Sequence, residues 1–294
     1  MKKYNYHRPQ TLKEAFRLME KYNGLARYIA GGTDIIVRIK KGVASPEALI
    51  SLRGLEELRG IEVDGAGALT VGSMTLIREL EREPVFTKNL PALSQAAVAL
   101  ANPQVRNVAT VGGNLANAAP SADCAPPLLA LEAWLTLEGP GGKRDVPISE
   151  FFQGPGRTCC APLEIITRIT IPSLPDKTGM AFLKSVRVNQ DIALTNAAAL
   201  LVMEDGMCRK CRLAVGAVAP VPLRLKATES AIEGQKIDKE LLGRVGAMVE
   251  SEISPITDVR ASEDYRRVVT GVIVGRAIKQ ALRKVYPDGQ EVLG

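Results

Sequence analysis

Two glycine pairs in the sequence have closely similar surroundings. The first lies in Ile29-Ala30-Gly31-Gly32-Thr33-Asp34 and the second in Ala109-Thr110-Val111-Gly112-Gly113-Asn114. Each pair follows an apolar run that is typical of a strand. Glycine adopts positive φ angles readily, so that successive backbone N–H groups can converge and bind an anion. Two such nests predict a site that holds the two phosphates of a dinucleotide from both sides.

Neither turn fits the best-known phosphate-binding motifs. No Gly-Lys-Ser/Thr follows, as a Walker A loop requires, and neither turn has the Rossmann spacing Gly-x-Gly-x-x-Gly. Nearby side chains add hydroxyl groups at Thr33 and Thr110 and an amide at Asn114. An ordinary turn remains the simpler interpretation of either pair alone, and the match between the two pairs favours the anion site.

Regular elements must position these turns. Apolar residues at helical spacing predict a helix over 11–22 with Thr11 as its N-cap, then a strand over 25–30, and helical spacing resumes at Ile35. The second turn follows a β-like stretch at 108–111. The other elements expected in this half are strands over 48–52, 61–63, 69–71, 134–138, 144–147 and 163–171 and helices over 75–82, 90–100 and 123–131.

The sequence changes character after Pro172-Ser173-Leu174-Pro175, so we place a domain boundary near residue 176. Beyond it we expect a hairpin of strands 193–202 and 211–218, then helices over 238–253 and 262–285. The predicted fold class is α+β. It comprises a domain over 1–175, with subdomains of about 1–55 and 56–175, and a smaller α+β domain over 176–294.

Composition excludes several classes of function. His7 is the single histidine, so a multi-histidine metal site cannot form, and a subunit contact or an ordinary surface position is expected for it. The charge balance is +3 in residues 1–175 and +3 in 176–294, which argues against nucleic-acid binding. No apolar stretch is long enough for a membrane span, and the N-terminus lacks the apolar core of a signal peptide, so a cytoplasmic location is expected.

The five cysteines do not indicate a metal site. Cys208 and Cys211 have metal-like spacing, but residues i and i+3 of a strand point to opposite faces, which makes a poor chelate. Cys159-Cys160 forms a second pair, and Cys124 lies beside Asp123. Ordinary thiols are expected. Trp134, on a predicted strand, is expected in the core.

The two glycine motifs resemble the FAD-binding segments of the flavoprotein subunits of molybdenum hydroxylases, such as aerobic carbon monoxide dehydrogenase and bacterial xanthine dehydrogenase. The similar segments are 30–37 and 110–123, and the resemblance continues through Gly154-Pro155-Gly156-Arg157, Ile169-Thr170-Ile171-Pro172 and Asp264-Tyr265-Arg266-Arg267. The resemblance implies the two-subdomain FAD-binding fold of vanillyl-alcohol oxidase and para-cresol methylhydroxylase, followed by the family's C-terminal domain.

The resemblance also implies which residues bind FAD. The backbone around Ala30–Asp34 and Thr110–Asn114 would hold the pyrophosphate, and Asp123 would match an acidic residue that contacts the cofactor. Ile166 would lie near the adenine or the ring edge, Lys184 near the flavin, and Leu115 and Ala116 beside the isoalloxazine. The full candidate set is Ile29, Ala30, Gly31, Gly32, Thr33, Asp34, Ile35, Ala109, Thr110, Val111, Gly112, Gly113, Asn114, Ala116, Asp123, Ile166 and Lys184.

By resemblance the chain is a subunit that passes electrons from [2Fe–2S] clusters through FAD to an external acceptor. The implied partners are a molybdopterin-binding large subunit and a [2Fe–2S] small subunit, in a dimer of heterotrimers, in the cytoplasm with or without attachment to the inner face of the membrane. No catalytic acid–base residue and no metal are expected in the chain itself, because the cofactor supplies the chemistry. The alternatives are a stand-alone FAD-dependent reductase of the same fold and an interaction subunit that has lost FAD. The helical stripe Val268–Val285 is either core or a docking face.

Overall fold

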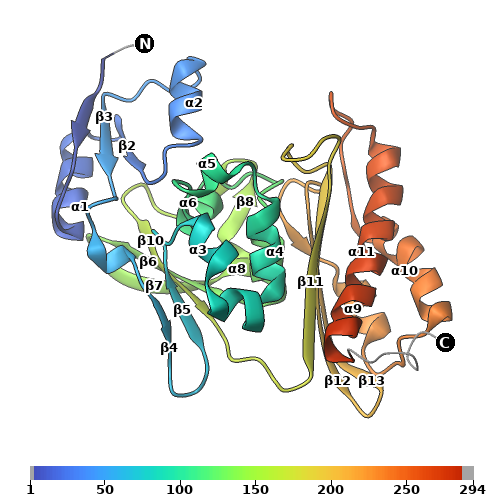
Figure 1. Cartoon of the computed structure of the whole chain (residues 1–294). Helices are drawn as coiled ribbons and strands as arrows, with labels where there is room; N and C mark the ends of the chain where they lie inside the picture. Colours follow the sequence, from blue (N-terminus) through green and yellow to red (C-terminus); the bar gives the residue numbers. More distant parts are fainter. Residues whose placement is uncertain (1–2, 287–294) are drawn as a thin grey trace.

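The computed structural model describes residues 3–286, and its parts follow one another along the chain from left to right in Figure 1. The first part is a parallel three-stranded sheet in the order β1-β3-β2. Its elements are β1 (Asn5–His7), α1 (Leu12–Lys21), β2 (Ala26–Ile29), α2 (Ile35–Lys40) and β3 (Ala48–Ser51). Thr11 Oγ1 accepts a hydrogen bond from Glu14 N at 3.2 Å, which caps α1 as predicted.

The second part is an antiparallel sheet in the order β4-β5-β10-β6-β7, covered on one face by short helices. Its strands are β4 (Ile61–Val63), β5 (Leu69–Gly72), β6 (Trp134–Gly139), β7 (Gly142–Pro147) and β10 (Ile165–Ile171). The other elements are η1 (Glu56–Leu58), α3 (Ile77–Arg82), η2 (Val85–Asn89), α4 (Pro91–Ala99), α5 (Pro103–Arg106), α6 (Val111–Ala116), α7 (Ala125–Ala130), α8 (Ile148–Phe151), β8 (Phe152–Gly154) and β9 (Arg157–Thr158).

The third part is a four-stranded antiparallel sheet in the order β11-β12-β13-β14. It comprises β11 (Thr178–Ser185), β12 (Thr195–Glu204), β13 (Met207–Gly216), β14 (Leu223–Arg224), α9 (Lys226–Ile232), α10 (Lys239–Glu252) and α11 (Glu263–Val285). Together the three sheets and their helices agree with the predicted α+β class. No helix in residues 3–286 is long and apolar enough to cross a membrane.

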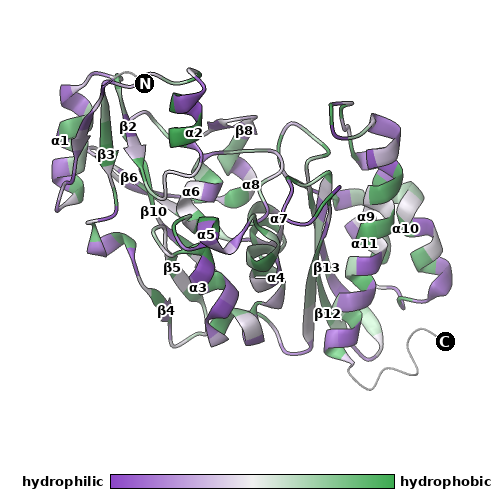
Figure 2. Ribbon diagram, turned by 45° about the horizontal axis from the view of Figure 1, so that its top comes forward, coloured by the Kyte–Doolittle hydropathy of each residue, from purple (hydrophilic) through white to green (hydrophobic). Residues whose placement is uncertain are grey.

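The third sheet is buried on both faces. Along β12, Ala197, Ala199 and Leu201 pack into a core that includes residues of α10 and α11, whereas Ala198 and Leu200 pack into the core of the second part. Helix α11 covers one face, and α4 and α7 cover the other. Figure 2 shows hydrophobic and hydrophilic residues on different sides of α11. The sheet is therefore the layer at which the second and third parts of the chain meet.

Two predictions about local structure are wrong. The stretch 108–111 is not a strand, because Val111 begins helix α6 and Thr110 makes only an isolated bridge to Leu76. The Thr110 side chain accepts a hydrogen bond from Gly113 N and so starts the helix. Trp134 is 45% exposed rather than buried, because it lies on the face of the second sheet that the helices leave open.

Helix α11 divides the stripe over 268–285 between two environments. Val274, Ala277 and Ala281 are buried against the third sheet. Val268 and Val272 are 59% and 44% exposed. The stripe is therefore core along its inner side and an open face along the outer side of its first turns.

Candidate cofactor-binding site

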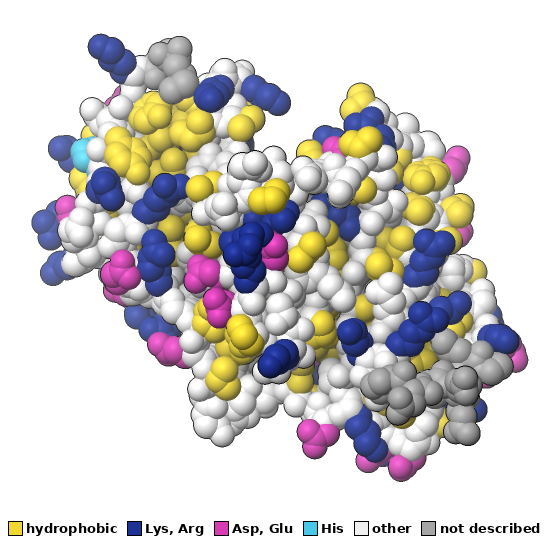
Figure 3. Space-filling view, in the orientation of Figure 1, with side chains coloured by type: hydrophobic (Ala, Val, Ile, Leu, Met, Phe, Trp, Pro, Cys, Tyr) yellow, Lys and Arg dark blue, Asp and Glu magenta, His cyan; other side chains and the backbone are white. Residues whose placement is uncertain are grey.

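A cleft of about 700 Å³ lies where all three parts of the chain meet. The first part contributes the loop after β2, the second contributes α6 and the segments 119–123 and 158–166, and the third contributes Lys184 and the loop 190–192. Figure 3 shows the surface hollowed between the N-terminal sheet and the C-terminal helices. The volume of the cleft is in the usual range for a cofactor site.

The first glycine pair forms the cleft wall nearest the N-terminal sheet. Gly32 has a φ of +80°, a backbone conformation that favours glycine. Among the described residues, none accepts a hydrogen bond from the backbone N–H groups of 31–35. Residues 31–35 line the cleft, so their N–H groups form a row of donors that is available to an anion there.

The second glycine pair is built differently. Its backbone N–H groups are already used, since Val111 N donates to Thr75 O at 3.0 Å and Gly112 N donates to Ser73 O at 2.9 Å. Gly113 N and Asn114 N donate to Oγ1 and O of Thr110. The prediction of an anion nest at this turn is therefore wrong, because the capped first turn of α6 takes up its donors.

The second motif instead supports the first. A Cβ on Gly31 would lie 2.3 Å from Val108 O, so the two motifs touch backbone to backbone. Asn117 Nδ2 donates to Asp34 Oδ1 at 3.2 Å, and Arg53 Nε donates to Ala30 O at 3.2 Å. The Asn117 contact holds the first loop against the end of α6, and the Arg53 contact holds it against the segment after β3.

Asn114 brings an unsatisfied acceptor to the cleft. Its Oδ1 atom is buried and has no donor among the described residues, although Asn114 lines the cleft. A buried acceptor without a partner costs free energy of about 1–3 kcal/mol. A hydroxyl group of a bound ligand would remove that cost.

The far end of the cleft contains a buried ion pair. Lys184 Nζ donates to Asp123 Oδ2 at 2.7 Å and to Ala99 O at 3.0 Å, and both charged side chains are 7% exposed. Asp123 Oδ1 accepts a second hydrogen bond, from Asn196 Nδ2 at 2.9 Å. Burial raises the pKa of the Asp123 carboxyl, and the ammonium of Lys184 and the amide of Asn196 oppose that effect.

The structure gathers nearly all the predicted site residues at this one cleft. Every member of the candidate set lines it except Val111, which is 1% exposed and packs in the core. Leu115, expected beside the cofactor ring, is also fully buried in the core and does not line the cleft. Both residues face inward from α6, so they act on the site only by packing.

Other residues line the cleft that the sequence motifs did not predict. Tyr28, Cys160 and the loop 190–192 come from segments to which no motif was assigned. Tyr28 Oη donates to Leu163 O at 3.3 Å, and burial raises the pKa of that phenol. Tyr28 lies two residues before Ala30, and this was the available signal, since residues i and i+2 of a strand point to the same face.

Cys208 and Cys211 do not point to opposite faces of the sheet, contrary to the prediction from strand spacing. Val202 pairs with Lys210 and Met203 with Cys208, so Arg209 is an extra residue in a β-bulge. The bulge brings both cysteines to the same core, where each is 0% exposed. No group of three or more potential metal ligands occurs within residues 3–286. His7 is half-buried, and its Nε2 lies 2.8 Å from Tyr22 Oη.

Two protein families match this chain. The family described as the FAD binding domain in molybdopterin dehydrogenase matches residues 2–174, and the CO dehydrogenase flavoprotein C-terminal domain matches 180–281. The xanthine dehydrogenase FAD-binding subunit of Escherichia coli O157:H7 is 34% identical over 280 residues, covering 95% of this chain and 96% of the relative. The carbon monoxide dehydrogenase medium chain of Hydrogenophaga pseudoflava is 33% identical, covering 95% and 97%.

Solved structures agree with these relatives. A chain of carbon monoxide dehydrogenase from Hydrogenophaga pseudoflava superposes with a TM-score of 0.92 at 34% identity, covering 95% of this chain and 97% of that one. A chain of quinoline 2-oxidoreductase from Pseudomonas putida 86 gives 0.91 at 28% identity, covering 97% and 99%. The chain therefore belongs to the family of FAD-binding subunits of molybdopterin dehydrogenases, with the flavoprotein C-terminal domain of CO dehydrogenase.

Proposed function

We propose that the cleft holds FAD with its pyrophosphate against the loop 31–35. The observation that carries this proposal is the row of backbone N–H groups in that loop, which have no acceptor among the described residues although they line the cleft. Phosphate oxygens are acceptors of the kind such a row binds. The buried Oδ1 of Asn114 fits the same cofactor, because the sugar-like chain of FAD carries hydroxyl donors.

The remaining residues have supporting roles in this proposal. Gly31 allows the close contact between the two motifs, and Asp34 ties the loop to Asn117 of the second motif. Ile166 gives the cleft an apolar wall. Asp123 and Lys184 provide charge at its far end.

The chain is an oxidoreductase subunit that transfers electrons through FAD. FAD supplies the redox chemistry, since it can accept and release electrons one or two at a time. The chain's own residues bind the cofactor, orient it and set the charge around it. This role agrees with relatives that are FAD-binding subunits and medium chains of xanthine and carbon monoxide dehydrogenases.

Such subunits work with a molybdopterin-binding large subunit and a [2Fe–2S] small subunit. We propose the same partners for this chain, in a dimer of heterotrimers located in the cytoplasm. The domain boundary near residue 176 also stays our proposal, with the linker 172–177 between β10 and β11. Sedimentation of the complex purified from its source would test the stoichiometry.

The proposed cofactor is tested by adding FAD to the full-length chain. We expect one FAD per chain and a flavin absorption spectrum that remains after gel filtration. FMN, which lacks the pyrophosphate and adenine, is expected to bind more weakly, because it makes fewer contacts along the cleft. A protein that stays colourless with added FAD would contradict the proposal.

Comparison of the isolated chain with the assembled complex separates this function from a stand-alone reductase. A stand-alone reductase would bleach its flavin when NADH is added to the isolated chain. The flavin of an electron-transfer subunit can also exchange electrons with NADH. The substrate of the complex, however, reduces this flavin only when the partner subunits are present. Substrate-driven flavin reduction in the assembled complex, and its absence in the isolated chain, is the expected result.

A further inference from the structure

Three residues form a row across the third sheet at the cleft. Lys184 on β11 pairs directly with Asn196 on β12, and Asn196 pairs with Gly216 on β13. Directly paired residues of adjacent strands point to the same face of a sheet. The row therefore faces the second part of the chain, where Asp123 lies.

Asn196 is in the centre of the row and is fully buried. Its Nδ2 atom donates to Asp123 Oδ1 at 2.9 Å, while Lys184 Nζ donates to Asp123 Oδ2 at 2.7 Å. Each oxygen of the carboxylate thus has one donor from the third sheet. Because an amide N–H can only donate, Asn196 favours the charged form of Asp123 over the protonated form.

Gly216 provides the space that this arrangement needs. A Cβ at residue 216 would lie 2.4 Å from Asn196 Oδ1 and 3.0 Å from Pro120 O. The next residue, Ala217, donates its N–H to Pro120 O at 2.7 Å. The segment 120–123 is therefore fixed to the sheet at both of its ends.

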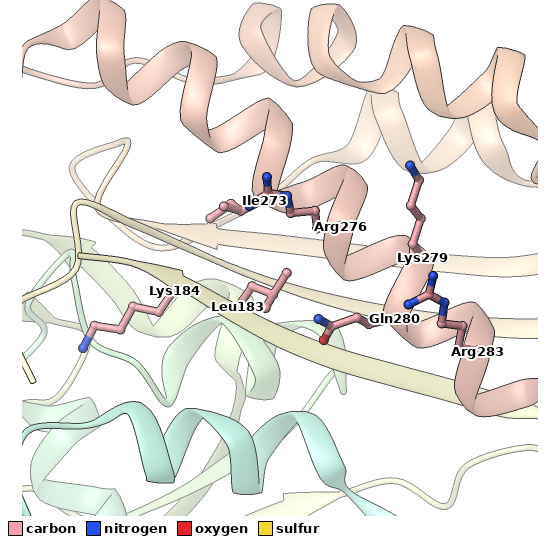
Figure 4. A pocket seen from close by; sticks show the side chains of 7 residues that line it. All are labelled: Leu183, Lys184, Ile273, Arg276, Lys279, Gln280 and Arg283. Atoms are coloured by element: carbon pink, nitrogen blue, oxygen red, sulfur yellow. The ribbon is translucent and has the colours of Figure 1, made fainter. Parts of the chain in front are cut away.

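The ammonium of Lys184 belongs to the cleft and not to the opposite face of β11. Lys184 also borders a second cavity of about 390 Å³ between β11 and α11, but Figure 4 shows its side chain pointing away from Leu183 and from the α11 side chains that line that cavity. That cavity carries Arg276, Lys279 and Arg283. The positive charge in the cleft comes from Lys184 alone among the buried side chains that line it.

We propose that Asn196 is a positioning residue that, through Asp123, fixes the Lys184 ammonium against the isoalloxazine end of the bound FAD. The proposal rests on the proposed function. Adenine stays neutral and gives no reason for a buried ion pair, whereas the isoalloxazine gains negative charge when it is reduced. A fixed ammonium stabilises that charge in a site with little water.

The test uses the full-length chain loaded with FAD and measures the flavin midpoint potential. Lys184→Met removes the ammonium and is expected to lower the potential. Asn196→Leu removes one of the donors that fix Asp123, so the ammonium is no longer held in one position against the flavin, and the potential is expected to fall in the same direction. In an Asp123→Asn background the effect of Asn196→Leu should vanish, because Asn196 acts only through the Asp123 carboxylate.

Thr195→Val is the matched control. Thr195 is fully buried on the same strand, and its Oγ1 accepts a hydrogen bond from Thr270 Oγ1 at 2.9 Å on the opposite side of the sheet. Asn196→Leu and Thr195→Val are both expected to lower the melting temperature of the FAD-free chain, and only Asn196→Leu is expected to shift the potential.

Two results would overturn the proposal. One is an unchanged potential in Asn196→Leu with the lowered melting temperature, which would leave Asn196 a purely structural residue. The other is a shift that persists in the Asp123→Asn background. Both outcomes require wild-type chain that binds FAD, so they are distinct from failure of the proposed function, in which the wild-type chain itself binds none.

Discussion

Gly31→Ala is expected to damage the cofactor site more than any other single methyl group added to the glycine motifs. The added Cβ would lie 2.3 Å from Val108 O and 2.8 Å from Ala109 Cα, both backbone atoms. The second distance is short of a normal carbon–carbon contact of about 3.5 Å. The two motifs must separate, because no flexible side chain can move aside.

The magnitude follows from the cost of overpacking. Insertion of an extra methyl group into a packed site costs about 1–3 kcal/mol, and two backbone neighbours place this case near 3 kcal/mol. For a chain of this size that corresponds to a melting temperature lower by roughly 6–12 °C. If FAD requires the motifs in contact, its Kd rises about a hundredfold.

The assay compares three variants by thermal unfolding and by FAD titration. Gly32→Ala meets only side-chain atoms at 3.2 Å or more but requires alanine at a φ of +80°, so a cost of about 1–2 kcal/mol is expected. Gly65→Ala is the control, since nothing lies within 4 Å of its Cβ. If Gly31→Ala matches Gly65→Ala in both melting temperature and FAD affinity, the close backbone contact at Gly31 does not matter to the site.

Three further predictions concern the frame around the cleft. Arg106→Met is expected to lower the free energy of unfolding by about 3 kcal/mol, because Arg106 pairs with Glu81 at 2.8 Å and donates to Leu100 O and Ala101 O; urea denaturation measures this. Arg266 and two backbone N–H groups lower the pKa of Asp258 from 3.8 to about 2 against the effect of burial. The stability difference between wild type and Asp258→Asn should therefore be full above pH 4 and disappear toward pH 2, and a difference that is constant with pH would contradict the assignment. Cys124, Cys208 and Cys211 are each 0% exposed and should not react with a thiol reagent at pH 8 until the chain unfolds, as peptide mapping would show.

The first glycine motif could be predicted because its signals are local. An apolar strand, two glycines and a resumed helical spacing lie within 29–36, and the structure has a strand, a loop and a helix there. The prediction of an anion nest at the second motif is wrong because its glycine pair, unlike the first, follows the N-cap residue Thr110. A single side-chain hydrogen bond from Gly113 N converts that turn into the start of a helix.

Other errors came from long-range packing. Strand β11 was not expected, because both of its faces are buried and Thr178–Ser185 shows no alternation of apolar and polar residues. Lys184 was found only by family resemblance, and its partner Asn196 is separated from Asp123 by 73 positions. The bulge at Arg209 likewise depends on how two strands pair, which spacing along one strand does not reveal.

The burial of the third sheet on both faces bears on how the chain can be divided. A fragment that begins after the linker would expose Met180, Phe182, Ala198, Leu200 and Ala214 to water, since these residues belong to the core of the second part. A fragment that ends at the linker would lose the third sheet, which covers α4 and α7. The regions matched by two separate families thus share one interior. Proteolysis between them would produce two fragments with exposed apolar surfaces that aggregate, instead of two independently folded proteins.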